Sequence, residues 1–256
     1  ASAAITGLAV PRPPSPPYLM EFTSVEGETT DITTGKFPVI TELRTVITQD
    51  LLNKGDKIYA TTLTTLAVDI AIKQADSNVA PFSGDNNGIT TEAEFLASLS
   101  VAASQVVSTL GVGLDKEVDI FDAPPLIDDS TNTIEKQKMV ASYRVAIETV
   151  TAIAHQISEQ SAGATADTVL TDLALDLADG GGIDGSVIGS SLNVTTLQVL
   201  QQDPATLPIP NDPSNRTVAD VQAILVEEIV VTGTTTNVEQ LNEGGAINVI
   251  PDIAPI

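Results

Sequence analysis

Five prolines between residues 11 and 17 constrain the start of the chain more than any other feature. Each proline lacks a backbone N–H, fixes its own φ and pushes the preceding residue toward extended geometry. A long helix cannot cross this segment, so the sequence predicts an extended arm over residues 1–38. Residues 3–10 and 18–25, on either side of the prolines, are apolar and short enough to form strands within that arm.

Beyond the arm, the apolar residues change to the 3.6-residue period of amphipathic helices. The expected helices cover residues 39–51, 63–74, 91–110, 133–160, 166–178, 194–201 and 218–229. The first is expected to stop at Gly55. The third opens with Thr91 and Glu94, which have the spacing of a capping box, and the fourth is expected to open at Asn132.

The end of the chain returns to residue types that favour strands. Residues 228–232 are rich in β-branched side chains, and residues 246–250 form an apolar run. The sequence therefore predicts an α+β fold that is mainly an α-helical bundle. We expect a proline-rich arm with short strands over 1–38, a helical domain over 39–229 and a β or extended segment over 230–256.

The charge and the rare residue types exclude several classes of function. The 34 acidic residues outnumber the 11 basic residues and give a formal charge of -23, which repels nucleic acid and favours cations as counter-partners. The absence of cysteine excludes disulfides, thiol catalysis and cysteine-ligated metals, and the single His155 excludes a multi-histidine metal site. We expect no enzymatic activity and no cofactor other than a candidate Ca²⁺ ion.

The small residues at the start of the chain, Ala-Ser-Ala-Ala, are typical of the segment that follows a removed signal peptide. No apolar run approaches the roughly 20 residues that span a bilayer, so we expect no direct membrane insertion. The sequence thus predicts an exported protein at the cell surface.

Several short stretches carry a family resemblance. They are Ile-Thr-Gly at 5–7, Tyr-Ala-Thr-Thr-Leu-Thr-Thr-Leu-Ala at 59–67, Asp-Leu-Ala-Asp-Gly at 176–180 and Ile-Asp-Gly at 183–185. Together they resemble a group of exported bacterial surface proteins in which a carboxypeptidase-regulatory-like or immunoglobulin-like β module precedes an α-helical domain. In that group the second stretch usually reads V-T-P-L-T-T-L-A, so Thr62 replaces a proline. The resemblance covers residues 39–200 and implies export and a structural or adhesive role.

One acidic loop is a candidate calcium site. Asp176, Asp179 and Asp184 surround the glycines at 180–182, and hard cations prefer carboxylate and carbonyl oxygens from a tight loop. The alternative is the end of a helix with glycine stops and solvated acids.

Two further oxygen-rich segments have similar alternatives. Asp85, Asn87, Glu92 and Glu94 either surround a cation or belong to a polar loop that runs into a capping box. The acidic residues of loop 115–129 are more typical of a solvated connection than of a metal site.

The predicted strands at both ends suggest assembly, because short strands need partners for their backbone groups. We expect these arms to add to the sheets of identical subunits and to build an extracellular filament. The contacting residues would be Ala3, Ile5, Leu8, Val10, Ile229, Val231, Ile247 and Val249. The alternative is a monomeric adhesion module that binds carbohydrate or calcium, with surface glycans as partners and its two ends paired within one chain.

Overall fold

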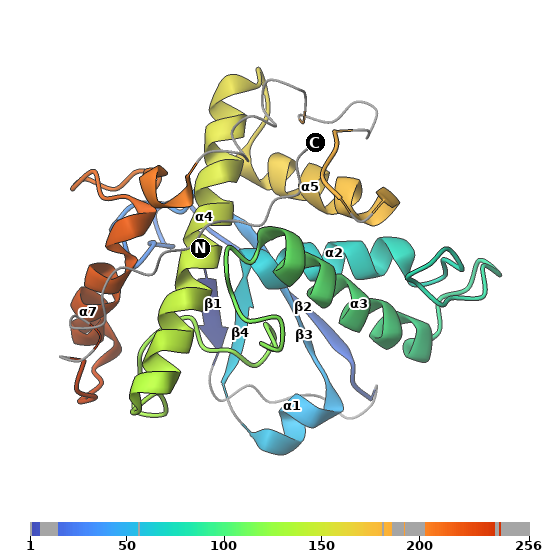
Figure 1. Ribbon diagram of the computed structural model, residues 1–256, viewed down its shortest axis with the longest axis horizontal. Helices are drawn as coiled ribbons and strands as arrows, with labels where there is room; N and C mark the ends of the chain where they lie inside the picture. Colours follow the sequence, from blue (N-terminus) through green and yellow to red (C-terminus); the bar gives the residue numbers. More distant parts are fainter. Residues whose placement is uncertain are drawn as a thin grey trace.

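The computed structural model describes residues 2–5, 15–55, 57–180, 182–185, 192, 203–238 and 241. In chain order the elements are β1 (Ser2–Ile5), β2 (Tyr18–Thr23), β3 (Glu42–Ile47), α1 (Gln49–Lys54), β4 (Ile58–Thr61), α2 (Thr62–Gln74), α3 (Glu92–Leu110), α4 (Ile134–Gln160), α5 (Ala166–Gly180), the 3-10 helices η1 (Pro204–Thr206) and η2 (Val218–Asp220), and α7 (Val221–Thr232). The predicted α+β class with a mainly helical body is confirmed (Figure 1). The predicted helix at 194–201 lies outside the described residues.

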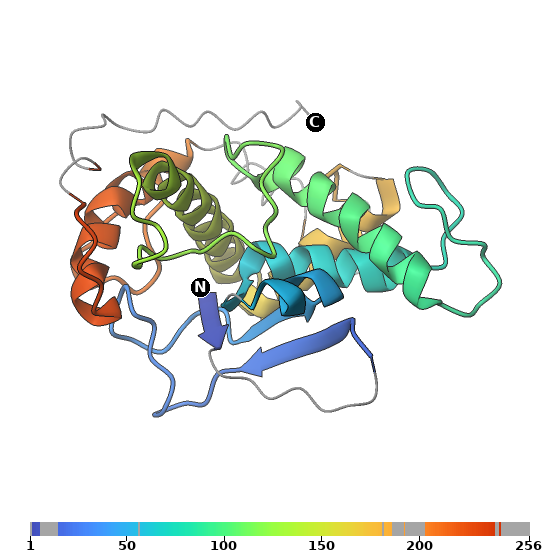
Figure 2. The same ribbon diagram turned by 90° about the horizontal axis from the view of Figure 1, so that it is seen from below.

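Helix α2 forms the centre of the core. Nine of its residues are buried, and Leu63, Leu66 and Ile70 have no exposed surface. Helices α3, α4 and α5 and strand β3 all pack against it. A helix that is apolar nearly all round is stable only when it is surrounded in this way. Figure 2 shows β2 at the outer edge of the molecule, on the far side of the strands from the helices.

The threonines at the start of α2 can be buried because their hydroxyls hydrogen bond locally. Thr61 precedes the helix, and its hydroxyl accepts the N–H of Thr64, whose own hydroxyl accepts the N–H of Thr61. The hydroxyl of Thr65 donates to the carbonyl of Thr61 at 2.7 Å. Thr62 is the first helical residue. Its N–H has no acceptor within the helix, and for that reason proline is common at this position.

The four strands form two separate antiparallel sheets of two strands each. Strand β1 pairs with β4, from Ser2 opposite Thr61 to Ile5 opposite Ile58. Strand β2 pairs with β3, and this pair confirms the strand predicted at 18–25. Each sheet therefore joins a piece of the predicted arm to a piece of the predicted helical body.

Arg44 fastens the second sheet to the core. From β3 its guanidinium forms ion pairs with Glu21 on β2 at 2.8 Å and with Asp69 on α2 at 3.0 Å. A third pair joins it to Glu42 at 3.1 Å. One side chain thus links both strands of this sheet to the central helix.

The predicted helix over residues 39–51 is wrong. The segment forms strand β3 and then the short helix α1, which begins after Thr48 and ends at Gly55 with a φ of +70°. The periodicity of a short apolar run does not distinguish a helix from a strand. Residues 45–47 are all β-branched, and such residues favour a strand. The pairing with β2 decides the conformation. The predicted stop at Gly55 is confirmed.

The other predicted helices within the described residues are confirmed, with small changes at their ends. Helix α3 has the predicted capping box of Thr91 and Glu94 and ends at Gly111. Helix α4 is capped by Thr133, whose hydroxyl accepts the N–H of Lys136, and not by Asn132.

The predicted strand at 228–232 is wrong, because α7 continues to Thr232. Gly233 ends this helix with a φ of +68°, and its N–H donates to the carbonyl of Ile229 at 3.0 Å. β-branched residues cost a helix only about 0.5 kcal/mol each, so the packing of α7 outweighs their preference for strands. Two predicted assembly residues therefore lie on a helix. Ile229 packs against the core, and Val231 is exposed.

A buried arginine joins α4 to α7 and to the arm. The five N–H groups of Arg144 donate to Glu148, to both carboxylate oxygens of Glu228, to the Thr33 hydroxyl and to the Pro125 carbonyl. Burial alone would lower the pKa of Arg144, but the two carboxylates raise it, so the guanidinium stays charged. Because every donor is used within the protein, this network is structural.

One helix among the described residues, α3, is long and apolar enough by length and composition to cross a membrane. This corrects the expectation that no such run exists. One such helix is weak evidence for a membrane span, because core helices have similar compositions. Here α3 packs against α2 and buries Leu99, Val106 and Leu110.

Candidate functional site

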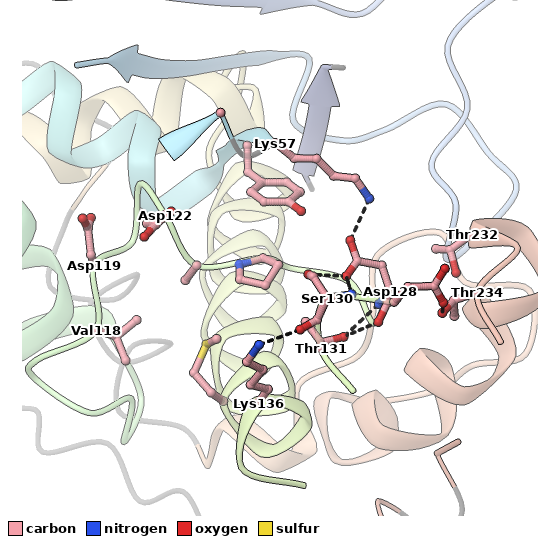
Figure 3. A pocket seen from close by; sticks show the side chains of 16 residues that line it. Lys57, Val118, Asp119, Asp122, Asp128, Ser130, Thr131, Lys136, Thr232 and Thr234 are labelled. Atoms are coloured by element: carbon pink, nitrogen blue, oxygen red, sulfur yellow. Dashed lines mark hydrogen bonds and ion pairs between the residues drawn. The ribbon is translucent and has the colours of Figure 1, made fainter. Parts of the chain in front are cut away.

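A cavity of about 750 Å³ opens between β4, the start of α4 and the end of α7 (Figure 3). Its walls come from Gly55, Lys57 and Tyr59, from residues of the loop 118–131, from the first turns of α4, and from Thr232 and Thr234. Small-molecule sites typically have volumes of about 300–1,000 Å³. We therefore take this cavity as the candidate binding site.

A buried tyrosine fixes the loop that forms one wall. Tyr143 on α4 is fully buried, and its hydroxyl donates to the carbonyl of Ile120 at 2.8 Å and lies 3.0 Å from the Thr61 hydroxyl. Burial raises the pKa of Tyr143, so the hydroxyl remains protonated and can donate. The loop is thereby tied to α4 and to the start of α2.

Asp128, near the end of the same loop, organises the side of the cavity that faces Asp119 and Asp122. Its Oδ2 accepts a hydrogen bond from Lys57 Nζ at 2.7 Å, and its Oδ1 accepts the N–H and the hydroxyl of Ser130 at 2.9 and 2.5 Å. Burial would raise the pKa of Asp128, but the hydrogen bonds from Lys57 and Ser130 outweigh it and lower the pKa below its ordinary value. The carboxylate is therefore charged and held in one orientation at neutral pH.

Asp129 connects this wall to the segment after α7. Its Oδ1 accepts hydrogen bonds from the Thr234 hydroxyl and, at 3.2 Å, from the Thr235 N–H. The hydrogen bond from Thr234 is the main cause that lowers the pKa of Asp129. The threonines at the edge of the cavity are thus held against the loop.

Two more side chains complete the polar lining. Lys136, in the first turn of α4, donates from Nζ to the Ser130 carbonyl at 2.8 Å. Asp122 forms an ion pair with Lys54, just outside the cavity. Figure 3 shows Asp119 and Asp122 across the cavity from Asp128, with Lys136 on the α4 side.

The lining can bind hydroxyl groups in both directions. Its carboxylates accept hydrogen bonds, its ammonium groups donate them, and its serine and threonine hydroxyls do both. Tyr59, Pro124 and Met139 add apolar surface. Among the described lining residues, four aspartates face two lysines, so the site disfavours anions.

The predicted calcium residues are not gathered into a site. Asp176 is fully buried, and its Oδ2 accepts the N–H groups of Asp184 and Gly185 at 2.7 and 3.1 Å. The carboxylates of Asp176, Asp179 and Asp184 do not form a close group of ligand atoms. Asp176 closes the loop after α5, and its burial differs from the solvated acids of the alternative interpretation.

The loop before α3 does bring carboxylates together. Oxygens of Asp76, Asp85 and Glu94 lie within 4.8 Å of one another, the one such group among the described residues. Asp76 accepts the N–H groups of Asn87 and Gly88 at 3.0 and 2.8 Å, and Glu94 accepts that of Asp85 at 3.0 Å. These carboxylates close the loop and cap α3. Exposed acidic groups alone do not indicate a metal site.

The structure describes only half of the predicted assembly residues. Ala3 and Ile5 lie on β1, which pairs with β4 of the same chain. The backbone of this strand thus has partners within its own molecule, contrary to the premise behind the predicted filament. The remaining four, Leu8, Val10, Ile247 and Val249, lie outside the described residues.

A second cavity, of about 390 Å³, lies beside the arm. It is lined by Arg144, by threonines of the turn at 29–33 and by apolar residues such as Phe22 and Leu43. The N–H groups of Arg144 are all used within the protein, so the charged group that would recognise a ligand is already occupied.

The sequence contained one signal for the first cavity. Four aspartates of loop 115–129 belong to its wall, although their pattern predicts a solvated connection. Its partner Lys57 lies 71 residues before Asp128, and no local pattern predicts that pair. No sequence motif marks Lys136 or Thr234, and only the fold brings them to the cavity.

No protein-family model, curated protein or solved structure matches this chain. The resemblance to exported surface proteins therefore stays a prediction, and the functional argument depends on the geometry of the chain itself.

Proposed function

We propose that this chain is a cell-surface binding module, not an enzyme, and that its cavity between β4, α4 and α7 binds neutral carbohydrate. The observation that carries the proposal is the mixed lining, in which carboxylates, ammonium groups and hydroxyls surround about 750 Å³ beside apolar surface. A sugar presents the matching combination of hydroxyl donors, hydroxyl acceptors and C–H faces. The cell-surface location is inferred from the resemblance that the stretches at 5–7, 59–67, 176–180 and 183–185 carry together.

The charge distribution favours a neutral ligand. An anionic ligand would face an excess of aspartates. A cationic ligand would find two of those aspartates already paired, Asp128 with Lys57 and Asp122 with Lys54. Neutral hydroxyl groups can bind without breaking these ion pairs, because they can form hydrogen bonds with the donor and acceptor positions that the pairs leave open.

The lining is ordered before any ligand arrives. Asp128 is held by Lys57 and Ser130, and Lys136 by the Ser130 carbonyl. A preorganised site loses less entropy on binding, and it rejects ligands that leave its polar groups unpaired. Selectivity for hydroxyl-rich molecules follows from this order.

The test is calorimetric titration of the full chain with maltotriose, cellotriose, mannotriose and the N-acetylglucosamine trimer. Spermidine serves as a cationic probe, and inorganic phosphate as an anionic probe. We expect saturable binding of at least one saccharide and no binding of phosphate.

Lys136→Ala should weaken saccharide binding by about tenfold, the effect of losing one charge-assisted hydrogen bond. Lys138→Ala is the matched control, because Lys138 lies on the same helix, is exposed and does not line the cavity. Equal affinity of the two variants, no binding of the four saccharides, or binding of spermidine alone would overturn the proposal.

A further inference from the structure

Strand β1 is attached to the body mainly through its pairing with β4. The two strands form their own sheet in antiparallel register, and the main contacts of β1 with other elements are with β4. Strand β4 leads directly into α2, and its residues Tyr59, Ala60 and Thr61 are buried. Without β1, the backbone N–H and C=O groups along this edge of β4 would lack strand partners.

We propose that β1 exchanges between copies of this chain, so that the β4 of one molecule is completed by the β1 of another. The hydrogen bonds of the pair depend only on the register, from Ser2 opposite Thr61 to Ile5 opposite Ile58. The exchanged form therefore contains the same contacts as the closed molecule, which is the usual basis of domain swapping. The partner is a second copy, and the interface is the β1–β4 pair.

The connection between β1 and β2 has the length and sequence for such an exchange. Residues 6–17 separate the two strands and include five prolines. Twelve residues can span up to about 40 Å, enough to reach an adjacent molecule. Proline-rich segments act as semi-rigid spacers, which favour an extended connection between the segments that they join.

The charge of the chain gives this association a distinctive salt dependence. Copies with a formal charge of -23 repel one another, and salt screens that repulsion. The β1–β4 pairing is a backbone interaction, so salt does not weaken it. The fraction of exchanged molecules should therefore increase with ionic strength. An association through ion pairs would instead become weaker as the ionic strength rises.

The experiment uses two single variants of the full chain, Ala3→Cys and Ala60→Cys. These positions are directly opposite in the register, and the natural chain has no cysteine. The two variants are mixed at high concentration in 0.5 M salt and oxidised, and the products are separated by non-reducing electrophoresis. We expect a disulfide-linked dimer that contains one copy of each variant.

Each variant oxidised alone is the control for random collision. Ala60 has no exposed surface, so a cysteine there is reachable mainly by the strand that pairs with it. The double variant, oxidised when dilute, should be locked as a monomer and remain one when concentrated. No mixed dimer above the level of the controls, or a purely monomeric natural chain in light scattering at high concentration and high salt, would overturn the proposal.

Discussion

The ion pairs around Arg144 and those around the cavity both join distant segments of the described chain, and the two sets differ in exposure. Around Arg144, the arginine and Glu228 retain only 3% and 5% of their side-chain surface. Around the cavity, Lys57 and Asp128 retain 47% and 14%. The buried set uses every donor of its arginine, whereas the ammonium of Lys57 donates one hydrogen bond to Asp128. The first set holds the fold together, and the second leaves hydrogen-bonding capacity for a ligand.

The largest expected effect comes from breaking the buried set. Arg144→Met should lower the free energy of unfolding by about 3–5 kcal/mol, because it leaves Glu148 and Glu228 buried without their cation. Urea denaturation measures the loss. The triple variant Arg144→Met, Glu148→Gln and Glu228→Leu should recover part of it, and a loss below 1 kcal/mol for the single variant would show that the network is not structural.

A smaller effect is expected at the tyrosine that supports the cavity wall. Tyr143→Phe removes the donor to the buried Ile120 carbonyl and should cost about 1–3 kcal/mol. The same variant should speed hydrogen exchange of backbone amides in loop 118–131. Tyr18→Phe, on β2 and not among the residues that line the cavity, is the control, and unchanged exchange in the loop would contradict the assigned role of Tyr143.

The hydrogen-bonded carboxylates around the cavity should make the free energy of unfolding sensitive to acid. The pKa values of Asp128 and Asp129 are lowered in the folded protein, so their stabilisation is present above the unfolded pKa of about 3.9. It is lost as the pH falls through the lower folded values. The free energy of unfolding, measured from pH 6 to pH 2, should therefore decline below about pH 4. Asp128→Asn should flatten part of that decline, and an unchanged slope would contradict this origin.

The smallest effect is expected at the start of α2. Thr62→Pro should change stability by less than about 1 kcal/mol, because proline suits the first helical position and Thr61 already has extended geometry. Leu66→Pro, one turn into the same helix, should cost about 3 kcal/mol or more. Thermal unfolding of both variants provides the comparison, and similar losses would show that Thr62 does not occupy the first position.

The helices were predictable where one face or a cap marked them. Thr91 with Glu94 located the start of α3, and the stripe along α4 located nearly its whole length. The prediction failed at β3 and at the end of α7, where β-branched residues fit both conformations and contacts far along the chain decide. The cavity could not be predicted for the same reason, because Lys57 and Asp128 come together only when the chain folds.

Strand β4 belongs to both of the features from which we infer function. It contributes Tyr59 to the cavity, and its four residues, Ile58–Thr61, lie opposite those of β1, with Ala4 opposite Tyr59. Any ligand that distinguishes a closed molecule from an exchanged one must shift the balance between them by the ratio of its two affinities, and exchange must alter ligand affinity by the same factor. Through this four-residue strand, the proposed binding of a ligand in the cavity and the proposed exchange of β1 would each depend on the other.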